Sequence, residues 1–320
     1  MPVPTARRFR RLVYLLTLGL LLGHVQPLTA QSQANPLAAT ESKEAAGPEF
    51  DLSDVLVTRT PLPSASVEVR YRYERDRDRQ EDGSAVTHIH QPSLNLSLTV
   101  TDWLGLSTTL PYQIRDKRAP GGSSEARNLG DVSTEVLITF LKDPMRQLAL
   151  AGGFDLGFPT GSTQDGTGGQ WALTPFLGTG KLVGPVQLMA DVSFQDDFRA
   201  APDGGKAMRE LLYNLAVAYP LFETQLLPFL EVNGAYAFSG VPTIRHRGQI
   251  SLMPGVRISP TGWWVALAEP RPTTTRTAQS NAPGDTPWWQ RLSFAVGAQF
   301  PVTSARELEW ALTSALKLDF

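Results

Sequence analysis

The sequence of 320 residues contains no cysteine and only four histidines, and 19% of its residues are charged. Without cysteine there is no disulfide framework, thiolate metal site, cysteine nucleophile or lipid-modified cysteine. No stretch beyond residue 30 has 18 consecutive apolar residues, so helical membrane spans are not expected. The composition also excludes a collagen, a coiled coil and a fully disordered chain.

The first 30 residues have the features of a secretory signal peptide. Four arginines lie within the first eleven residues, and no acidic residue precedes Glu41. The apolar run at 12–25 is short against the ~20 residues of a spanning helix, and the small residue Ala30 follows it. We predict a signal peptide at 1–30, with an N-terminal membrane anchor as the alternative. Its removal lowers the formal net charge from −2 to −6, which argues against a nucleic-acid partner.

Residues 31–63 are polar and have no sustained period, so we predict a periplasmic linker there. From Ser64 onward, apolar and polar residues alternate, as in Val67, Val69 and Tyr71 with charged residues between them. A period of two gives each strand one apolar and one polar face. We predict twelve strands, at residues 64–74, 86–101, 104–115, 131–141, 147–158, 170–181, 185–196, 209–219, 225–238, 247–258, 289–300 and 307–320.

Most of these strands run 11 to 14 residues, whereas strands of soluble proteins average about 5–6 and a tilted strand needs ~9–11 to cross a bilayer. Aromatic residues such as Trp103 and Trp171 lie near strand ends, as at membrane interfaces. Short turns alternate with longer polar loops, at 75–85, 116–128, 159–169 and 197–208. These features predict an all-β protein, an antiparallel transmembrane β-barrel of about 12 strands. A soluble β-sandwich is the alternative.

Two segments leave details open. Residues 263–267 resemble a further strand, but both termini of such a barrel lie on one side only if the strand number is even. We interpret 259–287 as an irregular excursion at the periplasmic end, or as half of a pair that would give 14 strands. At the C-terminus, Leu308, Leu312 and Leu316 fit a helical stripe as well as a strand.

The chain ends at Phe320 with Leu318 and Leu316 at alternate positions before it, which resembles the C-terminal signal of bacterial outer-membrane proteins. Short motifs resemble a family of outer-membrane transporters named for the meta-pathway of phenol degradation: LGDV at 129–132, GFDLGFPTG at 153–161, MPGVR at 253–257 and QFPVT at 299–303. The resemblance covers roughly residues 64–320. It implies a barrel in the outer membrane of a diderm (Gram-negative) bacterium, transport of aromatic or hydrophobic compounds, and no catalytic residues.

Patterns for catalysis or metal binding are weak. His88 and His90 lie on one face of a strand, but no third metal ligand lies nearby in the sequence. The charged run at 76–83 misplaces the glycine and closing glutamate of a calcium loop, and the glycine-rich loop at 159–170 lacks the Lys-Ser/Thr of a phosphate loop. No distinctive serine motif accompanies His88 or His246. We therefore predict that the protein is not an enzyme and needs no metal or cofactor.

If the apolar phase faces lipid, the polar phase faces the lumen. This predicts fourteen pore-lining residues: Glu68, Arg70, Arg72, Asn95, Gln113, Arg115, Glu135, Asp155, Gln187, Asp191, Asn214, Glu231, Asn233 and Arg257. Their mixed charges could line a narrow, weakly selective pore, or pair with one another and fill the lumen. Twelve strands fall between about eight for a filled barrel and about sixteen for an open porin, so the strand number leaves both open.

We predict a monomeric outer-membrane channel for the passive passage of small solutes, with aromatic or hydrophobic compounds suggested by the resemblance. Its expected partners are outer-membrane lipid, the barrel-assembly machinery and a small-molecule permeant. No domain large enough to plug the lumen is expected before the first strand. The alternatives are a filled barrel with a structural or surface-interaction role, and a secreted soluble β-protein.

Overall fold

The computed structural model describes residues 55–80, 83–119, 121–162, 169–198, 208–221, 226–239, 248–259, 291–303 and 308–320. The predicted signal peptide, residues 31–54 of the predicted linker and residues 260–287 lie outside these ranges. Within them, no helix is long and apolar enough to span a bilayer.

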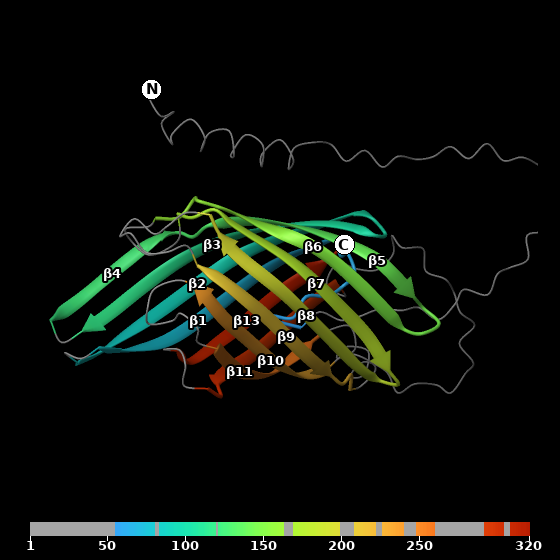
Figure 1. Cartoon of the computed structure of the whole chain (residues 1–320). Coiled ribbons are helices and arrows are strands. Elements are labelled where there is room, and N and C mark those ends of the chain that lie inside the picture. The colour runs from blue at the N-terminus through green and yellow to red at the C-terminus, as the bar shows by residue number, and fades with distance from the viewer. Residues whose placement is uncertain are drawn as a thin grey trace, which may run out of the picture. The chain divides into compact units, whose positions relative to one another are not determined.

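Thirteen antiparallel strands make up the described fold (Figure 1). In chain order they are β1 (Ser66–Gln80), β2 (Gly83–Thr101), β3 (Leu104–Ala119), β4 (Gly122–Leu129), β5 (Val132–Asp143), β6 (Leu148–Phe158), β7 (Ala172–Val183), β8 (Val186–Asp197), β9 (Arg209–Ala218), β10 (Leu226–Ser239), β11 (Gly248–Ile258), β12 (Leu292–Pro301) and β13 (Leu308–Asp319). Because β1 pairs with both β2 and β13, twelve strands close into a barrel. The predicted fold class and strand number are confirmed.

Pairing around the ring decides the strand number and the secondary structure of the C-terminal segment. β11 pairs directly with β12, so no further strand of the ring lies between them and the fourteen-stranded alternative is wrong. The C-terminal segment is the strand β13, which pairs along its length with β1 from Ser66 opposite Asp319 to Tyr73 opposite Leu312. Closing the sheet there satisfies the backbone groups of what would otherwise be two edges.

The predicted loops at 75–85 and 116–128 are wrong, because these residues extend two hairpins. β1 and β2 stay paired as far as Gln80 opposite Gly83, and β4 pairs with the outer half of β3. β4 and β5 thus follow each other along β3, and the β3–β4 hairpin extends away from the ring (Figure 1). A hairpin with water on both faces needs no apolar face. In these two hairpins the alternation of apolar and polar residues is therefore lost, although the strands remain paired.

The two faces of the barrel invert the polarity of a soluble protein. Outward-facing apolar side chains such as Val69, Leu98 and Leu177 are more than half exposed, whereas the inward-facing carboxylates of Glu231 and Asp191 are buried. Apolar side chains outside and polar ones inside are the arrangement of transmembrane barrels. A β-sandwich would instead bury apolar faces between two sheets, and here one closed sheet encloses the polar faces.

Gly153 of β6 is required by close packing on the inner wall. A Cβ atom there would lie 1.8 Å from the backbone oxygen of Val136 and 2.9 Å from the Phe176 ring. We expect Gly153→Ala to destabilise the barrel by about 1–3 kcal/mol through overpacking, measured as a lower urea midpoint in mild detergent. Gly178→Ala is the matched control, because its nearest contacts would be 3.7 Å away. Equal midpoints for the two variants would contradict this account.

Candidate functional site: the barrel lumen

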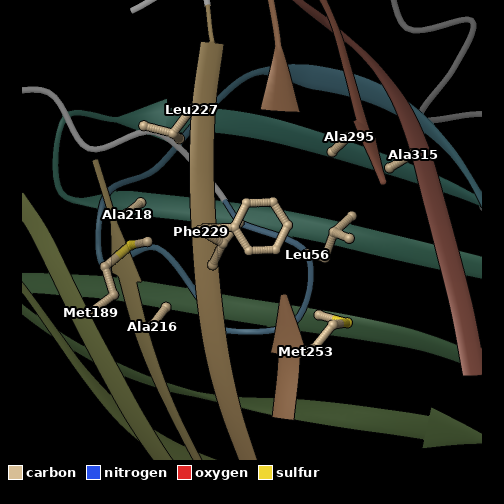
Figure 2. Packing of buried hydrophobic residues seen from close by; sticks show 10 residues of the cluster. Leu56, Met189, Ala216, Ala218, Leu227, Phe229, Met253, Ala295 and Ala315 are labelled. Atoms are coloured by element: carbon tan, nitrogen blue, oxygen red, sulfur yellow. The ribbon is translucent and has the colours of Figure 1, made fainter. Parts of the chain in front are cut away.

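A short segment before the first strand lies against the inner wall of the barrel. Residues 55–63, which we call the strap, were predicted as the end of the periplasmic linker, but they contact lumen-facing residues of several strands. Leu56 is 2% exposed and packs in an apolar cluster with Met189, Phe229 and Met253 (Figure 2). The apolar residues of the strap thus find a buried environment inside the lumen.

Glu231 of β10 anchors one end of the strap. Its carboxylate accepts hydrogen bonds from three consecutive backbone N–H groups, those of Leu56 at 2.7 Å, Val57 at 3.0 Å and Thr58 at 3.1 Å. The side chain is fully buried. A buried carboxylate is costly unless hydrogen bonds satisfy it, so the strap and Glu231 satisfy each other.

Arg59 anchors the middle of the strap. Its guanidinium pairs with Glu135 of β5 at 2.9 Å and with Asp191 of β8 at 3.3 Å, and its backbone N–H donates to Asp191 at 3.0 Å. The guanidinium also lies 4.6 Å from the centre of the Phe176 ring. Burial alone would lower the pKa of Arg59, but the carboxylates of Glu135 and Asp191 outweigh it, so the pKa is raised and the charge is retained.

The last residues of the strap lie against strands β5 and β6. Thr139 donates a side-chain hydrogen bond to the carbonyl of Pro61, and Leu62 and Leu182 both pack against Ala149. Proline supplies no backbone N–H and has a fixed φ, which suits an extended segment without strand partners. The strap therefore contacts the wall from β10 to β5.

A cavity of about 730 Å³ remains between the strap and the wall formed mainly by β1, β2 and β3. Charged side chains on β1 form pairs within it. Arg70 pairs with Glu68 at 2.8 Å, and Asn95 of β2 donates to the same Glu68 oxygen at 3.0 Å. Arg72 pairs with Glu74 and donates to Gln299 of β12. The wall of the cavity therefore carries paired charges on β1 beside apolar side chains such as Leu56 and Leu62 of the strap.

The fourteen predicted pore-lining residues fall into three groups. Those on the cavity surface are Glu68, Arg70, Arg72, Asn95, Glu135, Asn214 and Asn233. Those buried on the inner wall, outside the cavity lining, are Gln187, Asp191, Glu231 and Arg257. Those half-buried outside the cavity lining are Gln113, Arg115 and Asp155. The structure thus brings half of the set to one cavity and assigns Asp191 and Glu231 to holding the strap.

The two histidines considered as metal ligands are paired with tyrosines. The Tyr71 hydroxyl lies 2.7 Å from Nδ1 of His90, and the Tyr73 hydroxyl lies 2.6 Å from Nδ1 of His88. The described ranges contain no group of three or more histidine and acidic side chains that could hold a metal ion. Both histidines thus form hydrogen bonds with tyrosines of the neighbouring strand β1.

A closed barrel with an apolar exterior and a polar lumen defines the architecture of outer-membrane proteins. No protein-family model matches the sequence, and no curated protein is similar to it. The fold is similar to an outer membrane channel from Pseudomonas putida F1, with a TM-score of 0.57 and 11% sequence identity over 84% of this chain and 100% of that chain.

Two further solved structures are similar at lower scores. The NanC porin has a TM-score of 0.46 and 9% identity over 79% of this chain and 98% of its own. The β-domain of the Bordetella autotransporter BrkA has a TM-score of 0.46 and 12% identity over 81% of this chain and 100% of its own. The likeness to the Pseudomonas channel, at 11% identity, establishes a shared fold alone, so function has to be argued from the lumen.

Proposed function

We propose that this protein is an outer-membrane channel through which small solutes pass without an energy source. The supporting observation is the cavity beside the strap, which occupies the lumen along the paired charges of β1. Hydrated solutes tolerate such a wall, because polar groups replace part of their hydration shell. The strap narrows the lumen, so the proposed channel is selective by size as well as by charge.

Arg70 is the residue with which to test conduction through this cavity. Arg70→Glu replaces one positive charge with a negative one on the cavity surface, so we expect selectivity to shift toward cations. The measurement is the reversal potential across a planar bilayer in a salt gradient. Arg118→Glu makes the same charge change at an exposed position of β3 that is absent from the cavity lining. Equal reversal potentials for both variants and the wild type would remove Arg70 from the conducting path.

A second candidate function is a filled barrel with a structural or surface-interaction role. It is favoured by the strap itself, because Glu231, Arg59 and Asp191 use charges to fix a segment inside the lumen. Insertion of the purified protein into a planar bilayer separates the two. Stepwise conductance supports the channel, and insertion without conductance supports the filled barrel.

The remaining parts of the proposal follow from the sequence. An exported chain with this barrel is proposed to lie in the outer membrane of a Gram-negative bacterium, as a monomer inserted by the barrel-assembly machinery. The short motifs that resemble the phenol meta-pathway family favour aromatic or hydrophobic permeants. Uptake of labelled solutes by vesicles containing the protein tests this last point.

A further inference from the structure

Arg257 of β11 is a buried cation with no hydrogen bond or ion pair to any other residue that the structure describes. It is 7% exposed, and its Nε atom has no hydrogen-bond partner among the described residues. None of the ion pairs formed within the described part of the chain includes it. This contrasts with Arg59, Arg70 and Arg72, each of which has a carboxylate in contact. An unpaired buried charge is among the costliest features of a protein interior.

The nearest neighbours of Arg257 in the sheet are apolar. Its two neighbours in the sheet register are Leu227 of β10 and Ala295 of β12, and Ala315 of β13 lies opposite Ala295. These three residues belong to the apolar cluster that also contains Phe229 (Figure 2). An ion pair formed here would be strong, because little water screens it.

Ser293 supplies a second unsatisfied group at the same place. Its hydroxyl is buried without a partner among the described residues. It lies two residues from Ala295 on β12, so it is a diagonal neighbour of Arg257 on the inner face, at a typical spacing of about 7–8 Å. On its other side Ser293 lies opposite Lys317 of β13, whose ammonium pairs with Asp319. Arg257 and Ser293 thus place two donor groups beside the apolar cluster, and neither Nε of Arg257 nor the Ser293 hydroxyl has an acceptor among the described residues.

We propose that Arg257 and Ser293 bind the carboxylate of a small monocarboxylic acid with an apolar body, such as an aromatic acid. A planar carboxylate matches the donor geometry of a guanidinium, and Leu227 and Phe229 provide an apolar surface for the rest of the solute. A solute with several charges would bring excess negative charge into this cluster. The proposal rests on the proposed channel function and names the class of solute that the lumen accepts.

The same geometry couples binding to the strap. Leu56 occupies part of the apolar cluster beside Phe229, so the apolar body of a bound solute competes with Leu56 for this surface. The solute and Leu56 of the strap therefore exclude each other from this part of the inner wall. Displacement of the strap by the solute widens the cavity on its other side.

The test measures binding separately from conduction. Urea midpoints of the purified protein in mild detergent are compared with benzoate, with acetate, which lacks the apolar body, and with benzyl alcohol, which lacks the charge. We expect benzoate to raise the wild-type midpoint more than acetate or benzyl alcohol does, because benzoate has both the charge and the apolar body. A solute that binds only the folded barrel stabilises it against urea. Arg257→Met should raise the midpoint without solute, since it removes an unpaired buried charge, and should weaken benzoate binding at least about tenfold.

Two control variants make each outcome decisive. Arg118→Met removes an exposed arginine and should match the wild type in both measurements. Acidic residues at 49, 51 and 54 precede the strap in the sequence and are a competing source of carboxylate. Neutralising them together should leave the midpoint unchanged; a lower midpoint would assign Arg257 to this chain's own carboxylates and overturn the proposal. A lower midpoint for Arg257→Met, or an undiminished benzoate response, would also overturn it. If benzoate binds normally but the protein does not conduct, the result contradicts the proposed channel function and leaves the proposed binding site standing.

Discussion

Deletion of the strap, residues 55–63, is expected to raise the single-channel conductance several-fold and to make the channel cation-selective. The strap contacts the wall from β10 to β5, so its removal joins the space that it occupies to the existing cavity. It also removes Arg59, which leaves the carboxylates of Glu135, Asp191 and Glu231 facing the widened lumen. A wall with three uncompensated negative charges attracts cations and excludes anions.

The measurement for this prediction is conductance and reversal potential in planar bilayers. Deletion of residues 31–47 is the matched control, because it shortens the chain before the barrel and keeps the strap. We expect this control to behave as the wild type. Unchanged conductance after removal of the strap would show that the limiting constriction lies elsewhere, and unchanged selectivity would show that the three carboxylates lie outside the conducting path.

The barrel could be predicted from the sequence because its driving pattern is local. Each strand carries its own alternation, as in Val67 to Tyr73, and each is long enough to reveal the period. All twelve ring strands were found in this way. The predicted strand ends were wrong where β1–β2 and β3–β4 extend beyond the ring, because a polar hairpin has the composition of a loop. The register of β1 and β2, which pairs Gln80 with Gly83, cannot be predicted from composition.

The lumen was harder to predict than the wall. Alternation placed Glu231 and Asp191 on the polar phase, but it could not show that they bind the strap, which lies 175 and 132 residues away in the sequence. The strap itself carried a signal: two valines, two leucines and two prolines around Arg59 form an apolar, extended stretch at the end of a polar segment. Nine residues are too few for a period to emerge, and pairing of Arg59 with Glu135 depends on ring closure.

Glu231→Ala is expected to release the strap while leaving it in the chain. Hydrogen bonds to a charged acceptor contribute about 1.5–3 kcal/mol each, and this carboxylate accepts from three backbone N–H groups that would otherwise be buried without partners. The losses are not additive, so we expect the bound state of the strap to lose about 3–5 kcal/mol. That loss corresponds to at least about a hundredfold shift toward the released state. Glu231→Gln keeps one acceptor oxygen and should give an intermediate effect.

The absence of cysteine from the chain makes the release directly measurable. Val55→Cys places a single thiol on the strap at a position that is 4% exposed, where a water-soluble maleimide reacts only when the strap leaves the wall. In this background Glu231→Ala should speed labelling by about a hundredfold and raise the conductance toward that of the strap deletion. Ser193→Ala, which removes a buried hydroxyl of β8 that has no partner among the described residues, should label as slowly as the parent. Equal labelling rates for these two variants would mean that Arg59 and the apolar contacts hold the strap without Glu231.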